Sequence, residues 1–392
     1  MVKPKGNRKF YYLDNAAAAP IATEVQKEMV RAMKFTGNPS SFNNVGRDAA
    51  EELKKARLAV ARFLGAHAEE IIFTSSGSEA NNMAIMCPAF IAPKMRNEII
   101  TTPIEHPSVL EPAKILWHEG KEVIYAKVDR EGLVDIEDIA SKISNKTLLV
   151  SVMYANNEIG TIEPIVKIGK LVKSQKGKGG LPLFHVDACQ SAGYLNMNVN
   201  SLGADLLSFN GSKIYGPRGV GVLYVRKGTK LMPYILGGGQ ERGLRAGTEN
   251  LPAITGLAKA VTLIKKEEGK KISALRDYFL EKIKNILPQA RINGALGNER
   301  LPNNVNISIS GMYSENLLLE LDKYGISAGS GSACMARSVE PSHVLKAIGV
   351  EKKYLNGALR FSMGRQTTKK EVDYILKILP KIVRDLKKRY AV

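Results

Sequence analysis

Separate turns of this chain carry residue types that together can bind an anionic cofactor and supply a reactive amine. Asp187 ends one strand-like run, Lys213 follows the next, and Gly77 with Ser78 joins a third run to a helix. Ligands of open α/β sheets bind at the carboxyl ends of the strands, so these turns are expected to converge. A lysine amine can hold an aldehyde as a Schiff base, and an aspartate can keep a pyridine nitrogen protonated. Helix-start amides bind phosphate, so the set indicates a site for pyridoxal phosphate.

Each of these residues also has an ordinary structural explanation when it is taken alone. Asp187 suits a turn or a helix cap, Lys213 suits a charged surface, and Ser78 suits a helix start. Their order and spacing at the ends of different strands favour the cofactor hypothesis over these explanations.

The elements that must position these residues alternate between strand and helix through the first two thirds of the chain. Helical patterns, for example at 80–86 and 165–173, lie between several of the strand-like runs. This alternation predicts a largely parallel α/β sheet with helices on its faces. The strand-like runs occupy 70–74, 98–102, 122–125, 148–152, 182–186, 206–209 and 221–225.

The pattern changes after Gly247. A mainly helical stretch is followed by short strands and further helices, which predicts a second, smaller α+β domain. The predicted helices cover 254–287, 315–324 and 369–388, and the predicted strands cover 305–309 and 358–362.

Composition and length narrow the class of protein. A chain of 392 residues exceeds what one compact core usually holds, which predicts two domains. No apolar run is long enough for a membrane span and no signal peptide is recognisable, so we expect a cytoplasmic protein.

The net charge of +19 comes without a motif that reads nucleic acid, which favours a solvated basic surface and leaves a transient acidic partner open. The three cysteines, Cys87, Cys189 and Cys334, have neither disulfide-framework nor zinc-site spacing, so no metal is expected.

Ordered motifs along nearly the whole chain resemble those of one enzyme family. The chain looks like a member of the aminotransferase class V group and, within it, of the cysteine desulfurases of the NifS/IscS branch. The resemblance implies the type I fold of pyridoxal-phosphate-dependent transferases. In that fold, a large domain over 14–255 has a mainly parallel seven-stranded sheet, and a small α+β domain comprises 1–13 and 256–392. The matching stretches are 12–17, 37–41, 73–79, 105–106, 156–160, 185–191, 213–217, 237–243, 245–248, 329–334, 340–345 and 359–362.

The resemblance assigns roles around the cofactor ring, pyridoxal 5'-phosphate. Lys213 would form the Schiff base, and Asp187 would pair with the pyridine nitrogen. Gln190 would donate to the phenolic oxygen, and Asn157 would lie near the ring and the substrate carboxylate. His106 would stack on the ring face and help to transfer protons.

The same resemblance assigns the phosphate contacts. Gly77, Ser78, Asn210 and Ser212 would hold the phosphate, with Thr248 reaching in from the second subunit of a homodimer. Relatives usually carry histidine where Ser212 stands and often serine where Asn210 stands, so cofactor affinity or turnover is expected to differ here.

On the substrate side, Arg360 would bind the carboxylate of L-cysteine through two hydrogen bonds, assisted by Asn38. Cys334 would accept the sulfur as a persulfide and release L-alanine. Its Gly/Ser-rich surroundings at 328–337 predict a mobile loop of the long kind, and nearby Arg337 would favour the thiolate. Packing is the expected role of Cys87 and Cys189.

The destination of the sulfur stays open, because an iron–sulfur scaffold protein and a tRNA-thiolation enzyme are both conceivable acceptors. The C-terminus ends soon after the last predicted helix, which puts in doubt the scaffold contact that relatives with longer tails make.

The alternatives to a cysteine desulfurase are a selenocysteine lyase or another class V enzyme of the aminotransferase type. A further alternative is a basic, catalytically weakened protein that binds tRNA or an acidic sulfur acceptor; its only support is the altered motif at 210–213.

Overall fold

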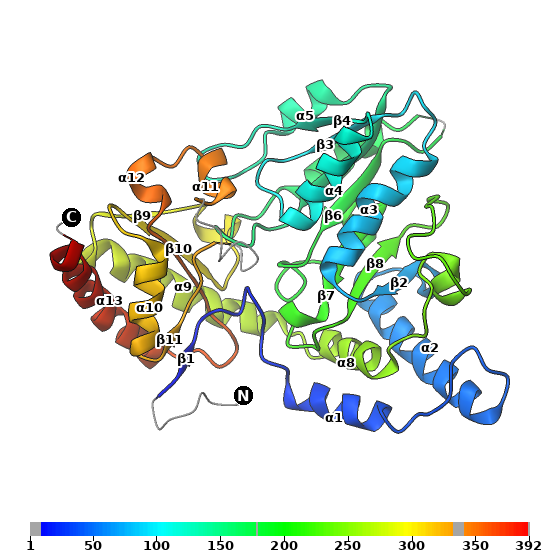
Figure 1. Cartoon of the computed structure of the whole chain (residues 1–392), viewed down its shortest axis with the longest axis horizontal. Helices are drawn as coiled ribbons and strands as arrows, with labels where there is room; N and C mark the ends of the chain where they lie inside the picture. The colour runs from blue at the N-terminus through cyan, green and yellow to red at the C-terminus, as the bar shows by residue number, and fades with distance from the viewer. Residues whose placement is uncertain (1–8, 178, 332–340, 391–392) are drawn as a thin grey trace.

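A central seven-stranded sheet organises the larger part of the molecule (Figure 1). The computed structural model describes residues 9–177, 179–331 and 341–390, and within them the strand order is β2-β8-β7-β6-β5-β3-β4. β8 runs antiparallel to its neighbours β2 and β7, and the remaining pairs are parallel. The mainly parallel sheet predicted from the sequence is therefore confirmed. Its strands are β2 (Ile71–Thr74), β3 (Glu98–Thr101), β4 (Glu122–Tyr125), β5 (Thr147–Met153), β6 (Leu183–Asp187), β7 (Leu206–Asn210) and β8 (Gly221–Val225).

Both faces of this sheet are covered by helices. Alternate strand residues point to opposite faces, so Phe184 packs into one apolar cluster with α2, α6 and α8. Leu183 packs into another cluster with α3 and α4. Burial on both faces explains why these strands appear in the sequence as continuous apolar runs. The helices of this part are α1 (Thr23–Ala32), α2 (Asn44–Leu64), α3 (Gly77–Ile91), α4 (Pro107–His118), α5 (Ile136–Lys142), α6 (Ile165–Ser174), α7 (Val199–Leu202) and α8 (Leu251–Thr262).

A second apolar core lies in the smaller part of the molecule, beside the large sheet (Figure 1). Its antiparallel sheet has the order β12-β10-β9, and the N-terminal strand β1 pairs with β11. Strands β1, β9 and β11 are too short to show a periodicity and were not predicted. The elements are β1 (Tyr11–Tyr12), β9 (Ala290–Ile292), β10 (Asn304–Ile309), β11 (Ile326–Ser327), β12 (Ala358–Ser362), α9 (Lys266–Ile286), α10 (Ser314–Lys323), α11 (His343–Ala347), α12 (Lys352–Leu355) and α13 (Lys369–Tyr390).

We propose that these two parts are the two domains expected from the sequence, 14–255 and 1–13 with 256–392. The expected boundary falls inside α8. The apolar side chains of α8, such as Leu257, belong to the core of the large sheet. This packing favours a boundary after α8 rather than within it. Among the described residues, no helix combines the length and apolar character that crossing a membrane requires.

The strand directions bring the expected site turns together. Strands β2, β3, β5, β6 and β7 all run the same way, so their carboxyl ends lie at one edge of the sheet. Asp187 is the last residue of β6 and Asn210 the last residue of β7. Gly77 and Pro107 begin the helices that follow β2 and β3.

Candidate active site

Most of the predicted site residues line one cavity of about 180 Å³ at this edge of the sheet. The carboxyl ends of five strands supply one wall of the cavity, and Arg360 enters from β12 of the smaller part. The predicted residues that line it are Gly77, Ser78, His106, Asn157, Asp187, Gln190, Asn210, Lys213 and Arg360.

Asp187 supplies a buried anion in this cavity. Its side chain lies at the end of β6, and the residue is only 5% exposed. Oδ1 accepts a hydrogen bond from the backbone N–H of Cys189 at 2.9 Å, and Oδ2 accepts one from Asn81 Nδ2 at 2.7 Å. Two donors fix the carboxylate without using all of its lone pairs, so it can still accept a bond from a protonated ring nitrogen.

The amine of Lys213 also lies in the cavity. It follows β7 on a short 3-10 turn (Gly211–Lys213). Nζ donates to the backbone carbonyls of Ala16 at 2.8 Å and Ala17 at 2.6 Å. Gln190 Nε2 donates to the same Ala16 carbonyl at 3.1 Å, which brings the Gln190 amide and the Lys213 amine together at one wall.

An anion site is built at the start of α3. Ser76 caps this helix, and its Oγ accepts from the Glu79 N–H at 3.1 Å. The first-turn amides of a helix, here those of Gly77 and Ser78, lack intrahelical acceptors and attract anions. A Cβ at Gly77 would lie 2.6 Å from Cys189 Sγ and 2.7 Å from Asn210 Nδ2. Glycine is therefore required for the close approach of these walls.

Ser212 contributes to this end of the cavity only through its neighbour. Its Oγ donates to Asn210 Oδ1 at 3.0 Å, and Ser212 does not line the cavity. This bond turns the Asn210 amide so that Nδ2 faces Gly77 and Cys189 Sγ, the latter at 3.7 Å. The family resemblance implied that both residues contact the phosphate, but only Asn210 borders the cavity.

His106 is the N-cap residue of α4 and borders the same cavity. Its Nδ1 accepts from the Ser108 N–H at 3.1 Å and lies 2.8 Å from Ser108 Oγ. Burial lowers the pKa of His106 below its usual value of 6.5; the Asp187 charge opposes this shift, and the Lys213 charge adds to it. Burial and the Lys213 charge outweigh the Asp187 charge, so the surroundings favour a neutral imidazole.

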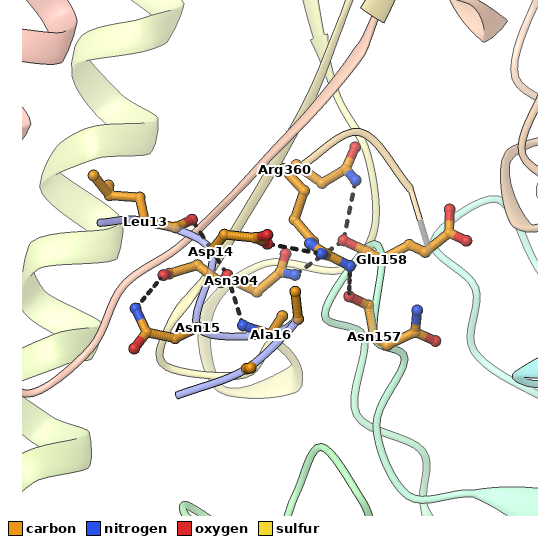
Figure 2. A network of polar contacts seen from close by, with 12 residues as sticks. Leu13, Asp14, Asn15, Ala16, Asn157, Glu158, Asn304 and Arg360 are labelled. Atoms are coloured by element: carbon orange, nitrogen blue, oxygen red, sulfur yellow. Dashed lines mark hydrogen bonds and ion pairs between the residues drawn. The ribbon is translucent and has the colours of Figure 1, made fainter. Parts of the chain in front are cut away.

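Arg360 supplies a buried guanidinium to the cavity and belongs to the network of polar contacts that Figure 2 shows. It is 1% exposed, and its Nη1 donates to the Asn157 carbonyl at 2.9 Å. Its Nη2 donates to Asp14 Oδ1 at 3.0 Å. The buried Nε–H has no hydrogen-bond partner among the described residues. The guanidinium therefore keeps donors for a carboxylate ligand.

Two further predicted site residues, Asn38 and Thr248, do not line this cavity. Asn38 is exposed, and its Oδ1 accepts from the Ser40 N–H at 2.9 Å, away from the cavity lining. Thr248 is exposed and does not line the cavity of its own chain. Cys334 lies outside the described residues.

The structure also adds residues that were not predicted from the sequence. Asn81 and Ser108 line the cavity and contact Asp187 and His106, and Asp14 pairs with Arg360. Asn81 stands four residues after Gly77 on α3, so helical spacing puts the two on one face. That spacing is a signal in the sequence that could have identified Asn81.

The chain belongs to the aminotransferase class-V family, which it matches over residues 11–375. Enzymes of this family use pyridoxal phosphate, and the described cavity fits this group. Asp187 suits the ring nitrogen, Lys213 suits the aldehyde, and the glycine-lined start of α3 suits the phosphate. The protein is therefore a pyridoxal-phosphate-dependent enzyme.

Within the family, the similarity is to cysteine desulfurases. A protein named cysteine desulfurase IscS from Dictyoglomus turgidum is 45% identical over 380 residues, which cover 96% of this chain and 95% of the relative. A solved NifS-like protein superposes with a TM-score of 0.89 at 37% identity, covering 96% of this chain and 100% of its own. The structure described as SspA in complex with cysteine gives a TM-score of 0.79 at 32% identity, covering 91% of this chain and 100% of its own.

Proposed function

We propose that this protein is a cysteine desulfurase, which moves the sulfur of L-cysteine onto Cys334, releases L-alanine and passes the persulfide sulfur to an acceptor. The observation that carries the proposal is the meeting of Lys213, Asp187 and Arg360 in one cavity of a chain so similar to cysteine desulfurases. The neighbour solved with cysteine supports an amino acid of this kind as the ligand.

At the cofactor end, bound pyridoxal phosphate would spread negative charge from the substrate Cα into its ring. Asp187 would hold the proton on the ring nitrogen. Lys213 would anchor the cofactor and, once displaced by the substrate amine, take the proton from Cα. Its anchoring by the carbonyls of Ala16 and Ala17 keeps Nζ on the cavity wall, within the same site as Asp187.

At the substrate end, Arg360 would bind the α-carboxylate through the donors that its protein contacts leave unused. Burial makes this charge-assisted pairing strong, because little water competes for the guanidinium. The carboxylate contact would fix the orientation of the substrate and turn Cβ and its sulfur toward the attacking thiolate.

The sulfur transfer is balanced without an external oxidant. The Cys334 thiolate forms an S–S bond to the substrate sulfur, and the bonding pair of the Cβ–S bond returns to Cβ. Cβ then takes up a proton, which yields alanine and a Cys334 persulfide. Since the thiolate is the nucleophile, the step weakens at a pH at which Cys334 is protonated.

We further propose a homodimer in the cytoplasm, in which Thr248 of each subunit reaches the phosphate of the other. The exposure of Thr248 and its absence from the cavity of its own chain support this arrangement. An iron–sulfur scaffold protein or a tRNA-thiolation enzyme would take the sulfur. Asn38 would assist Arg360, and Asn157 with Gln190 would contact the cofactor ring.

The proposed function is tested with purified protein loaded with pyridoxal phosphate and supplied with L-cysteine. Alanine and sulfide, measured in the presence of a reductant, are expected in equal amounts. Cys334→Ser should abolish both while the visible absorption of the cofactor stays intact, whereas Lys213→Ala should remove that absorption. Cysteine-dependent sulfide release that persists in Cys334→Ser contradicts the assignment of Cys334.

A further inference from the structure

A chain of hydrogen bonds links His106 to Asp187 through two residues to which no role has been given. Asn81 Nδ2 donates to Asp187 Oδ2 at 2.7 Å and to Ser108 Oγ at 2.8 Å. Ser108 Oγ in turn lies 2.8 Å from His106 Nδ1. Each member lies in or beside the cavity, and Asn81 is 1% exposed.

The donors in this chain determine where the imidazole carries its proton. An amide nitrogen only donates, so both hydrogens of Asn81 Nδ2 are used, one on Asp187 and one on Ser108 Oγ. Ser108 Oγ accepts from Asn81, which leaves its own hydrogen for His106 Nδ1. The Ser108 backbone N–H also points at this Nδ1, at 3.1 Å. A ring nitrogen that accepts from two donors carries no hydrogen, and the imidazole proton must be on Nε2.

We infer that Ser108 and Asn81 are positioning residues that hold His106 as a neutral imidazole with its proton on Nε2, so that it meets the cofactor ring without a positive charge. This inference rests on the proposed function in one respect only, namely that the ring facing His106 belongs to pyridoxal phosphate. A hydrogen on Nδ1 would point at the Ser108 N–H. Protonation of Nδ1 would therefore break both hydrogen bonds that this nitrogen accepts from Ser108. His106 therefore cannot become an imidazolium without losing its support.

A neutral His106 is consistent with the proton that Asp187 is placed to hold on the ring nitrogen. An imidazolium stacked on the ring would repel the proton that Asp187 is placed to hold on the ring nitrogen. The charged groups that act on His106 are Asp187, which favours the imidazolium, and Lys213 and His343, which oppose it. Burial has the largest effect and also opposes it. The hydrogen bonds and the net effect of burial and nearby charges thus both favour a neutral imidazole.

Nitrogen-15 NMR of the histidine-labelled, cofactor-loaded protein tests this inference without relying on turnover. His106→Asn identifies the His106 signals by their loss. At pH 7.5 the unmodified protein should show an unprotonated Nδ1 and a protonated Nε2. A hydrogen on Nδ1 would overturn the inference, whereas a lack of alanine and sulfide formation would count against the proposed function alone.

The variants measure how much the two positioning residues contribute. Ser108→Ala should raise the pKa of His106 by about one unit, because one hydrogen bond to the neutral form is lost. Asn81→Ala should raise the pKa of His106 by less, because the Ser108 hydroxyl loses only the hydrogen bond from Asn81 and can still donate to Nδ1. Ser108→Thr should restore the value of the unmodified protein.

Asn82→Ala is the matched control, because this half-buried neighbour of Asn81 donates to the backbone carbonyls of Ser78 at 2.8 Å and Ser108 at 3.4 Å and not to the Ser108 hydroxyl. A His106 titration that stays unchanged in Ser108→Ala would overturn the assignment of Ser108. If Ser108→Ala does not fold, as judged by thermal unfolding, the tautomer in the unmodified protein decides the inference.

Discussion

Asp14 pairs with Arg360, the residue that we propose binds the substrate carboxylate. Replacing Asp14 with asparagine tests that proposal. Asp14 Oδ1 accepts from Arg360 Nη2 at 3.0 Å (Figure 2). The Arg360 side chain is 2% exposed and that of Asp14 is 23% exposed. Asp14→Asn keeps the acceptor oxygen but removes the negative charge, so the hydrogen bond survives while Arg360 loses its counter-ion.

The expected loss of stability follows from the burial of this pair. Removing one partner of a fully buried ion pair costs about 3–5 kcal/mol. Asp14 is partly exposed and asparagine retains the hydrogen bond, so we expect about 1–2 kcal/mol here. A bound substrate carboxylate would restore the missing negative charge and recover this free energy. The variant should therefore unfold more easily, but bind L-cysteine or L-alanine about 5- to 30-fold more tightly.

Urea unfolding with and without L-alanine measures both effects on the cofactor-loaded protein, and the KM for L-cysteine gives an independent value. Asp48→Asn, at an exposed position of α2, is the matched control and should change neither quantity. A KM that rises in Asp14→Asn would show that Asp14 helps to bind the substrate rather than competing with it. A variant as stable as the unmodified protein would refute the reasoning about the buried charge.

Two further changes test the surroundings of the site. Burial raises the pKa of Glu105 to about 8 from its usual 4.5, so the folded protein holds this proton more tightly than the unfolded chain does. The contribution of Glu105 to stability is then full below about pH 4.5 and is lost as the pH rises to about 8. Glu105→Gln should therefore flatten the fall in unfolding free energy between pH 5 and 8, and an unchanged slope would contradict the buried neutral carboxyl. Gly77→Ala should weaken pyridoxal phosphate binding about tenfold, because its Cβ would displace Asn210 and Cys189. Spectroscopic titration measures this affinity, and Gly179→Ala, where a Cβ meets nothing within 4 Å, is the control that should bind normally.

The strands and the identity of the cofactor could be predicted from the sequence because both depend on local patterns. Strands buried on both faces appear as continuous apolar runs, and the expected run at 221–225 coincides with β8 (Gly221–Val225). The parallel order of the strands then brings Asp187 and Lys213 to one edge of the sheet. The two-residue strand β1 could not be predicted, since it exists only through its pairing with β11.

The sequence by itself determined the class of site, because an aspartate, a lysine and a glycine turn at strand ends suffice to indicate it. Only the tertiary structure decided which side chains support that site. Asp14 meets Arg360 across 346 positions of the chain, and Asn81 meets Asp187 across 106. Ser212 faces Asn210 instead of the cavity although it precedes Lys213. The physical reason is that backbone propensity acts over a few residues, whereas the direction of a side chain is set by what packs against it.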